Sequence, residues 1–177
     1  MLHKGGVFEQ LPDYPLAHCA TLAELPDGSL LTAWFGGAYE TSTDQVILAS
    51  RRKSSDGRWS APKVIAQVPG HALGQPVFLV RPDGELWLFF VVIMNPQPPP
   101  PSTGFNMLPP IAAWTSAQPY WQRSLDGGQS WTSPELLLDY PGLMFRSRPL
   151  VLSQRIVLPV YDENTWESRM MISEDDG

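Results

Sequence analysis

The chain has 177 residues, of which 11% are aromatic and 19 are proline, and its formal net charge is −6. This composition favours a β-rich, turn-dense domain over a helical one, and the negative charge argues against nucleic acid or an anionic membrane as a partner. No apolar run reaches the roughly 20 residues of a membrane span. The single cysteine, Cys19, excludes an internal disulfide bond.

The first 16 residues predict an irregular lead-in that lacks the apolar core of a signal peptide. We therefore expect either a cytoplasmic protein or one whose natural N-terminus lies further upstream. Apolar, β-prone segments separated by turn residues then predict four strands. They cover residues 19–25, 30–35, 45–50 and 63–66. A Pro-Asp-Gly-Ser turn joins the first two strands, and a polar loop over residues 36–44 precedes the third.

The same order of elements occurs twice more. The predicted strands of the second repeat cover residues 76–80 and 85–92, a segment ending at 124, and residues 136–138. Those of the third repeat cover residues 146–152, 156–161 and 169–172, and a fourth is missing. A proline-rich insert at about residues 95–119 interrupts the second repeat. Because proline restricts φ, we expect this insert to form a stiff rim, either in contact with substrate or without a role.

A turn motif follows the third strand of each repeat. Its full copy, residues 124–131, reads Ser-Leu-Asp-Gly-Gly-Gln-Ser-Trp. Asp126 can accept backbone N–H groups inside its own turn, the two glycines allow positive φ, and the tryptophan supplies a large anchoring ring. Reduced copies stand at residues 54–59 and 173–177. A repeat of about 50 to 70 residues is typical of a four-stranded propeller blade, and the alternative is one β-sandwich of short strands.

This motif resembles the Asp-box of sialidases and related β-propellers, and the resemblance extends from about His18 to Gly177. It implies an all-β fold, a β-propeller of the six-bladed sialidase type, of which this chain holds about three four-stranded blades. Outside the boxes, three segments are similar to a bacterial branch of predicted sialidases, namely residues 18–22, 30–37 and 158–163. After the lead-in over residues 1–16, the expected domain is a partial propeller over residues 17–177, with blades at about 17–68, 74–139 and 145–177.

A propeller buries each blade against two neighbours, so three blades leave open faces. The resemblance therefore implies that this is an N-terminal half whose partner is the set of missing C-terminal blades of the same propeller. We expect the isolated chain to be poorly soluble or partly unfolded.

Alternate connections of an up-and-down blade lie at opposite ends of its sheet. The boxes and the Pro-Asp-Gly turns therefore share one end, where we expect a structural role. The resemblance implies that substrate lies at the other end, and that an Asp on the loop after the second strand is the acid/base of the reaction. Asp44 occupies that position, and Glu40 is the second candidate or a ligand for a sugar hydroxyl. The alternative is that Asp44 merely caps the start of a strand.

Sialidases resemble one another in holding the sialic acid carboxylate with three arginines, because a guanidinium group matches a carboxylate. Two of these positions are occupied here by His18 and Ala38, so a sugar other than sialic acid stays open. Arg146 and Arg148 alternate along a predicted strand. They replace the missing cations if they face the central channel, and are otherwise solvated charges.

Tyr161 and Glu163 share one side of a predicted strand and end at the same face. They form either a subsite in which a sugar stacks on the ring beside a carboxylate, or an inter-blade hydrogen bond.

The resemblance implies an exo-glycoside hydrolase that removes a terminal sugar, acidic or neutral, from a glycan substrate. Water is the co-substrate, no cofactor is needed, and the fragment is expected to be inactive alone. The alternatives are a non-catalytic carbohydrate-binding propeller and a propeller for protein interactions. The three histidines have no ligand spacing, which argues against a metal site.

Overall fold

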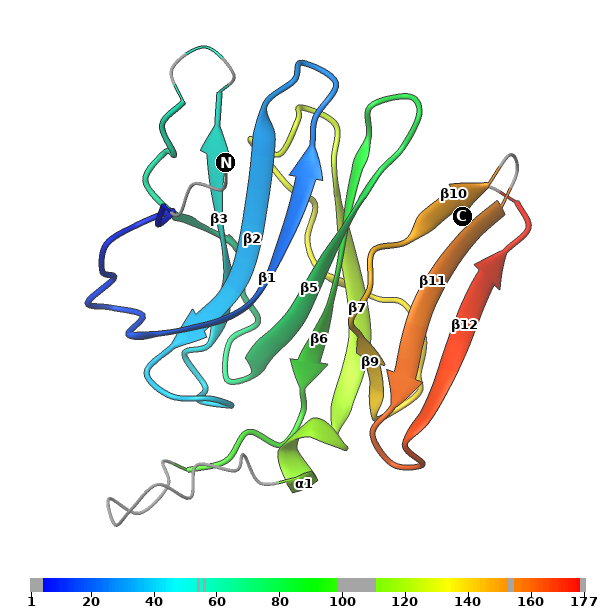
Figure 1. Cartoon of the computed structure of the whole chain (residues 1–177). Helices are drawn as coiled ribbons and strands as arrows, with labels where there is room; N and C mark the ends of the chain where they lie inside the picture. The colour runs from blue at the N-terminus through cyan, green and yellow to red at the C-terminus, as the bar shows by residue number, and fades with distance from the viewer. Residues whose placement is uncertain (1–4, 54, 56, 99–110, 153–154, 176–177) are drawn as a thin grey trace.

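The computed structural model describes residues 5–53, 55, 57–98, 111–152 and 155–175. Three antiparallel sheets of four strands each make up this part of the chain (Figure 1), so the all-β prediction is confirmed. One short helix, α1 (Ile111–Trp114), precedes a strand of the second sheet. No helix in the described ranges has the length and apolar character needed to cross a membrane. Residues 99–110 of the predicted proline-rich insert and parts of the two reduced turn motifs fall outside these ranges.

Each sheet is built from strands that follow one another in the chain, as in propeller blades. The first sheet has the order β1 (Leu16–Glu24), β2 (Leu30–Gly37), β3 (Val46–Arg52) and β4 (Lys63–Ala66). The second has the order β5 (Ala72–Val80), β6 (Leu86–Ile93), β7 (Ala117–Ser124) and β8 (Glu135–Leu136). In the third, β11 (Arg155–Asp162) pairs with β12 (Glu167–Ser173) on one side and with β9 (Leu143–Phe145) and β10 (Leu150–Leu152) on the other.

The innermost strands depart most from the prediction. β5 begins at Ala72 instead of residue 76, because a bulge absorbs Gln75 and Pro76 and lets the pairing with β6 continue beyond them. The prediction of one strand over residues 146–152 was wrong, since a gap separates β9 from β10. Pro149 lies in this gap and has no N–H to donate to a ladder.

Turns and longer connections lie at opposite ends of the sheets. Arg51 joins the turns at one end, which we call the box end: its guanidinium pairs with Asp27 Oδ2 at 2.5 Å and donates to Gly127 O at 3.2 Å. The connections β2–β3, β6–β7 and β11–β12 lie at the other end, which we call the loop end (Figure 1). Tyr39 Oη donates to Gln97 O at 3.2 Å and so joins the first two of these connections.

One carboxylate organises the full turn motif at the box end. Asp126 Oδ1 accepts hydrogen bonds from Gln129 N and Ser130 N, both at 2.9 Å, and from Ser124 Oγ at 2.8 Å. These bonds, led by those from Ser130, hold the pKa of Asp126 far below its usual value. The carboxylate is therefore occupied in closing its own turn.

Aromatic side chains fill the spaces between the sheets. Phe35, Phe78, Phe90 and Phe145 are fully buried. Trp131 of the turn motif stacks on Phe78, with ring centroids 6.1 Å apart, and so anchors the motif to its own sheet as the sequence predicts.

Two buried glutamines tie the first sheet to the second. Gln45 Nε2 donates to Leu73 O at 2.6 Å, while its Oε1 accepts from Thr41 N at 2.8 Å. Gln122 Nε2 donates to Ile65 O at 2.7 Å. Buried side-chain hydrogen bonds hold their partners in one geometry. The β2–β3 connection is therefore fixed in place on β5.

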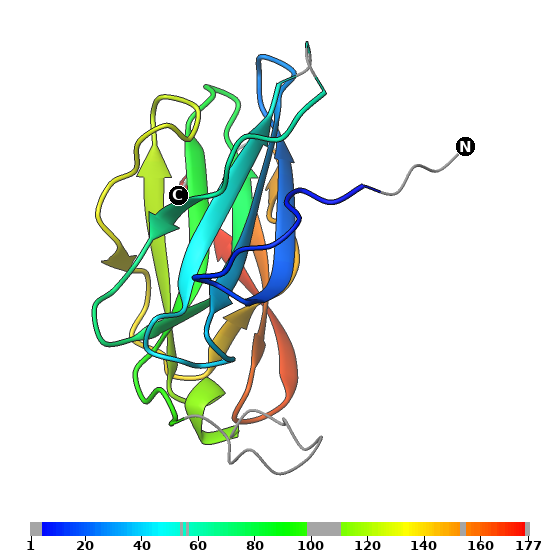
Figure 2. The same ribbon diagram turned by 90° about the vertical axis from the view of Figure 1, so that its left-hand side faces the viewer.

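The lead-in covers the face of the first sheet that points away from the second. Four of its side chains pack on three buried residues of β2 and β3, with Val7, Phe8, Leu11 and Tyr14 lying against Trp34, Val46 and Leu48. The rings of Phe8 and Trp34 stack with centroids 5.0 Å apart. Figure 2 shows this segment crossing over the first sheet.

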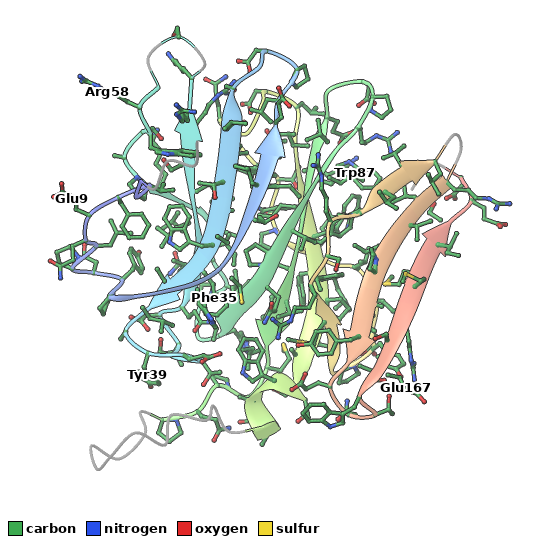
Figure 3. The ribbon with its side chains drawn as sticks, in the orientation of Figure 1. Glu9, Phe35, Tyr39, Arg58, Trp87 and Glu167 are labelled. Carbon is green, nitrogen blue, oxygen red and sulfur yellow. The ribbon has the colours of Figure 1, made fainter. Side chains whose placement is uncertain are left out.

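We expect Phe8→Ala to lower the free energy of unfolding by about 1–2 kcal/mol, because the half-buried ring loses its contact with Trp34. Urea denaturation followed by tryptophan fluorescence measures the effect. Glu9 is exposed and is labelled in Figure 3, so Glu9→Ala is the matched control, with an expected change within about 0.5 kcal/mol. Equal midpoints for the two variants would mean that the lead-in does not stabilise the fold.

The third sheet has an uncovered apolar face. Leu150, Leu152, Met170 and Ile172 are 56%, 51%, 60% and 57% exposed. They alternate along their strands with residues that pack toward the second sheet, so they lie on the opposite face. An apolar sheet face of this kind normally packs against a further layer.

Candidate functional site

Backbone strain is concentrated at the loop end. In the ranges that the structure describes, four residues other than glycine have positive φ, namely Cys19 at 53°, Thr41 at 68°, Gln75 at 53° and Trp166 at 61°. Cys19 and Gln75 lie in the bulges of β1 and β5, and Thr41 and Trp166 lie in connections of the loop end. In the turns of the box end, positive φ falls on glycines, namely Gly28, Gly57, Gly84, Gly127 and Gly128.

A residue with a side chain in this conformation costs on the order of 1–3 kcal/mol and persists where its surroundings hold it. Such strain gathers at functional sites. The strained residues therefore make the loop end the candidate functional end, on grounds separate from any family resemblance.

The pairing of the innermost strand is interrupted in each of the three sheets. The register of β1 shifts after His18, that of β5 shifts after Gly74, and the third sheet has its gap between β9 and β10. Together they leave a cavity of about 210 Å³ on the side where β1, β5 and β9 meet. Its lining includes Cys19, Gln75, Arg146 and Arg148.

Charged groups from two sheets come together beside this cavity. Burial raises the pKa of Glu40, and the neighbouring His18 and Arg146 partly offset this rise. Burial also raises the pKa of the Cys19 thiol, with Arg146 opposing it and Glu40 adding to it. Glu40, His18, Cys19 and Arg146 therefore form one electrostatic cluster, although they come from three separate segments of the chain.

Arg146 also contacts Tyr161, an aromatic residue of the third sheet. Its guanidinium lies over the ring of Tyr161 at 5.5 Å from the centroid. Burial raises the pKa of Tyr161, with neighbouring Arg146 opposing this rise and Glu163 adding to it. Glu163 N donates to Gly142 O at 2.8 Å, which holds the start of this connection against the chain before β9. Arg146 and Glu163, the charged groups that act on Tyr161, thus belong to the same part of the chain as the third sheet.

Asp44 forms its hydrogen bonds within its own connection. It is exposed, and its two carboxylate oxygens accept the Ala38 N–H at 3.3 and 3.2 Å. This bond closes the β2–β3 connection on itself. Arg148 is exposed and shares the cavity lining with Arg146.

The side-chain view places the connections that surround the site. Tyr39 and Glu167, from the first and third sheets, lie at the loop end, whereas Arg58 projects at the box end (Figure 3). Phe35 lies beneath the cluster, and the His18 ring packs edge-on against it at 5.5 Å between centroids. The His18 ring therefore has an apolar support on one side.

Asp162 holds the β11–β12 connection and was not singled out from the sequence. The side chain is only 1% exposed, and it accepts Tyr140 Oη at 2.7 Å, Asn164 N at 2.8 Å and Thr165 N at 3.2 Å. The hydrogen bond from Tyr140 is the main reason that its pKa lies below the usual range. Arg169 pairs with it at 3.4 Å. An Asp followed two residues later by Asn is a turn signal that could have indicated this role.

Gln75 was also missed. It precedes a proline, a position that disfavours helical backbone angles but gives no hint of positive φ. Among the described residues, no group of three or more His, Cys, Asp and Glu side chains is arranged to hold a metal ion.

Residues 28–177 match the sequence profile of a family described as BNR repeat-like domain. The chain belongs to this family. No curated protein gives a significant match to the sequence.

Solved structures similar to this BNR repeat-like domain include three carbohydrate-active enzymes. The NanB sialidase of Streptococcus pneumoniae shares 12% identity at a TM-score of 0.73, over 98% of this chain and 45% of that one. The intramolecular trans-sialidase of Ruminococcus gnavus shares 9% at 0.70, over 93% and 59%. An α-L-arabinanase of Penicillium chrysogenum shares 17% at 0.64, over 96% and 50%.

Identities this low show the fold alone. The BNR repeat-like domain is therefore part of a sialidase-type β-propeller, as predicted, with its three sheets as blades and its ring incomplete. This fold is shared with glycoside hydrolases. The chain spans about half the length of these three structures, between 45% and 59%.

Proposed function

We propose that this BNR repeat-like domain belongs to an exo-glycoside hydrolase that removes a terminal sugar from a glycan, with water as the second substrate. The observation that carries the proposal is the cluster of Glu40, His18 and Arg146 beside a 210 Å³ cavity at the strained end of the blades. Acidic groups with shifted pKa values at a concave site with a strained backbone are typical of catalytic centres.

Hydrolysis of a glycosidic bond needs an acid that protonates the leaving oxygen and a base that activates water. Asp44 is our first candidate for this acid/base, on the family resemblance and on its place in the β2–β3 connection. Glu40 is the second candidate, because its raised pKa suits a group that must carry a proton. In the first assignment, Glu40 binds a sugar hydroxyl.

The cationic side of the cluster favours an acidic sugar. Arg146 has Tyr161 beneath its guanidinium and lies near Glu40 and His18. A guanidinium group can receive a carboxylate with two parallel hydrogen bonds. Arg148 shares the cavity and supplies a second positive charge. Tyr161 and Glu163 then form the flank against which the sugar ring lies.

The partner of this chain follows from its open face. Leu150, Leu152, Met170 and Ile172 expose apolar surface on the third blade, and the similar structures are about twice as long. We propose that further C-terminal blades of the same propeller cover this face. Since those blades complete the cavity, these residues alone are expected to be inactive.

A substrate panel tests the proposal. The protein in its full natural length is incubated with chromogenic sialosides, uronides and neutral glycosides, and release of the chromophore is measured. We expect turnover of at least one class, with acidic sugars preferred, and a higher KM for those substrates in Arg146→Ala. Absence of turnover across the panel contradicts the proposal.

One observation favours a second function. The Asp44 carboxylate is occupied by the Ala38 N–H, which suits a propeller that binds sugars without cleaving them. Calorimetric titration with the free sugars distinguishes the two, because a binding protein gives saturable heats and no product.

A further inference from the structure

Trp166 has the conformation that its turn normally gives to glycine. It is the last residue of the β11–β12 connection, its N–H donates to Asp162 O at 2.8 Å, and its φ is 61°. A residue with positive φ at the end of a short hairpin loop is usually Gly or Asn. For a bulky side chain this conformation is a true outlier.

Among the described residues, the fold supplies no packing reason for a tryptophan here. Its side chain is 77% exposed, the most of any large aromatic among the described residues. The turn is held without it, since Asp162 accepts the N–H groups of Asn164 and Thr165, and Asn164 Nδ2 donates to Pro141 O at 2.9 Å. A fixed turn therefore presents a strained, exposed ring at the loop end of the blades.

The position of this ring relative to the cavity suggests its use. Tyr161, which carries Arg146 on its ring, pairs with Ser168, and the chain runs on past Asp162 to the tip of the connection. At about 3.3 Å for each strand residue, Trp166 stands roughly 7 Å further out than Tyr161. This spacing is close to the size of one pyranose ring.

Charge selects the class of sugar. Glu167 follows Trp166 in the sequence, and the side chain of Glu167 is 62% exposed, although Arg169 pairs with it at 2.8 Å. Carboxylates beside a platform disfavour an acidic sugar and accept hydrogen bonds from the hydroxyls of a neutral one. We propose that Trp166 is a stacking platform for a neutral pyranose, one sugar away from the residue bound beside Arg146. This inference rests on the proposed glycoside hydrolase function and adds a second sugar position to it.

The test compares substrates of different length in the full-length protein. Trp166→Ala is expected to raise KM for a chromogenic or reducing trisaccharide about 10-fold, which corresponds to about 1.4 kcal/mol of lost stacking. Its KM for a single-sugar chromogenic glycoside stays within about 2-fold. Trp166→Phe is expected to keep most of the affinity for the trisaccharide. The control is Leu125→Ala, since Leu125 is 84% exposed and lies in the turn motif at the box end.

Stability gives an independent measurement. Trp166→Gly is expected to raise the midpoint of thermal unfolding, because glycine adopts positive φ without strain, while it loses the same trisaccharide affinity as Trp166→Ala. An equal effect on long and short substrates, or no effect on either, would overturn the inference. So would protection of Trp166 from N-bromosuccinimide in the sugar-free protein, since that shows the ring to be covered by protein.

Failure of the inference and failure of the proposed function are distinguishable. Calorimetric binding of the trisaccharide is measured in parallel with turnover. Binding that depends on Trp166 without turnover of any substrate supports the stacking role of Trp166 and contradicts the proposed hydrolase function. Turnover of the trisaccharide with a KM that is unchanged in Trp166→Ala supports the hydrolase function and contradicts the stacking role of Trp166.

Discussion

Asp44→Asn is expected to lower kcat for glycoside hydrolysis by about 10²–10⁴-fold with little change in KM, since it removes the group that moves the proton in the transition state. Asparagine can still accept the Ala38 N–H through its carbonyl oxygen, so the β2–β3 connection should keep its shape. Steady-state kinetics on the best substrate of the panel measures the change, and circular dichroism confirms that the fold is kept.

Glu40→Gln is the matched comparison, because Glu40 lies on the same connection. In the assignment preferred here it binds a sugar hydroxyl, so its loss raises KM more than it lowers kcat. Burial raises the pKa of Glu40, so its removal also changes the acidic limb of the pH profile of kcat/KM. The reverse pattern, with kcat lost in Glu40→Gln and kept in Asp44→Asn, makes Glu40 the acid/base and refutes the role given to Asp44.

Asp162→Ala is expected to lower the free energy of unfolding by about 3 kcal/mol at pH 7. The substitution leaves the hydroxyl of half-buried Tyr140 and the N–H groups of Asn164 and Thr165 without their acceptor, and Arg169 without its buried partner. Urea denaturation of the two proteins measures the difference in free energy.

The effect of Asp162 depends on pH in a definite direction. Its pKa is lower in the folded protein than in the unfolded chain, so the unfolded state binds the proton more readily. Its stabilisation is complete above the unfolded carboxyl pKa of about 3.9 and is lost as the pH falls through the folded value. The gap between wild type and Asp162→Ala should therefore narrow below about pH 4.

Glu167→Ala is the control for Asp162→Ala, because it removes a carboxylate that pairs with the same arginine but is exposed. An exposed pair contributes at most about 1 kcal/mol. A destabilisation of Asp162→Ala no larger than that of Glu167→Ala, or one independent of pH, would contradict the role of the buried network.

The repeated order of strands and turns could be predicted because neighbouring residues specify it. The strand expected at residues 63–66 is observed as β4 at Lys63–Ala66, and the turn motif closes through bonds that span four residues at most. The backbone angles that its glycines adopt are likewise a local property. A short segment of sequence contains all the residues that determine such a turn.

The candidate site could be predicted only in outline. The sequence placed Glu40, Arg146 and Tyr161 at the same end of the blades, because strand direction alternates. It did not show that burial raises the pKa of Glu40 or that Arg146 lies over the Tyr161 ring. It also predicted one innermost strand where the third blade has two short ones, since the gap reflects how that strand meets β5 and β11.

The sequence thus specified the blades, their turns and the end at which chemistry is expected, since these follow from alternation and turn residues. Packing of segments far apart in the chain decided the rest. Tyr140 reaches Asp162 across 22 residues, and the network they form holds Trp166 in a conformation that no local propensity favours. Contacts of this kind form only when the sheets are assembled, so no window of sequence contains them.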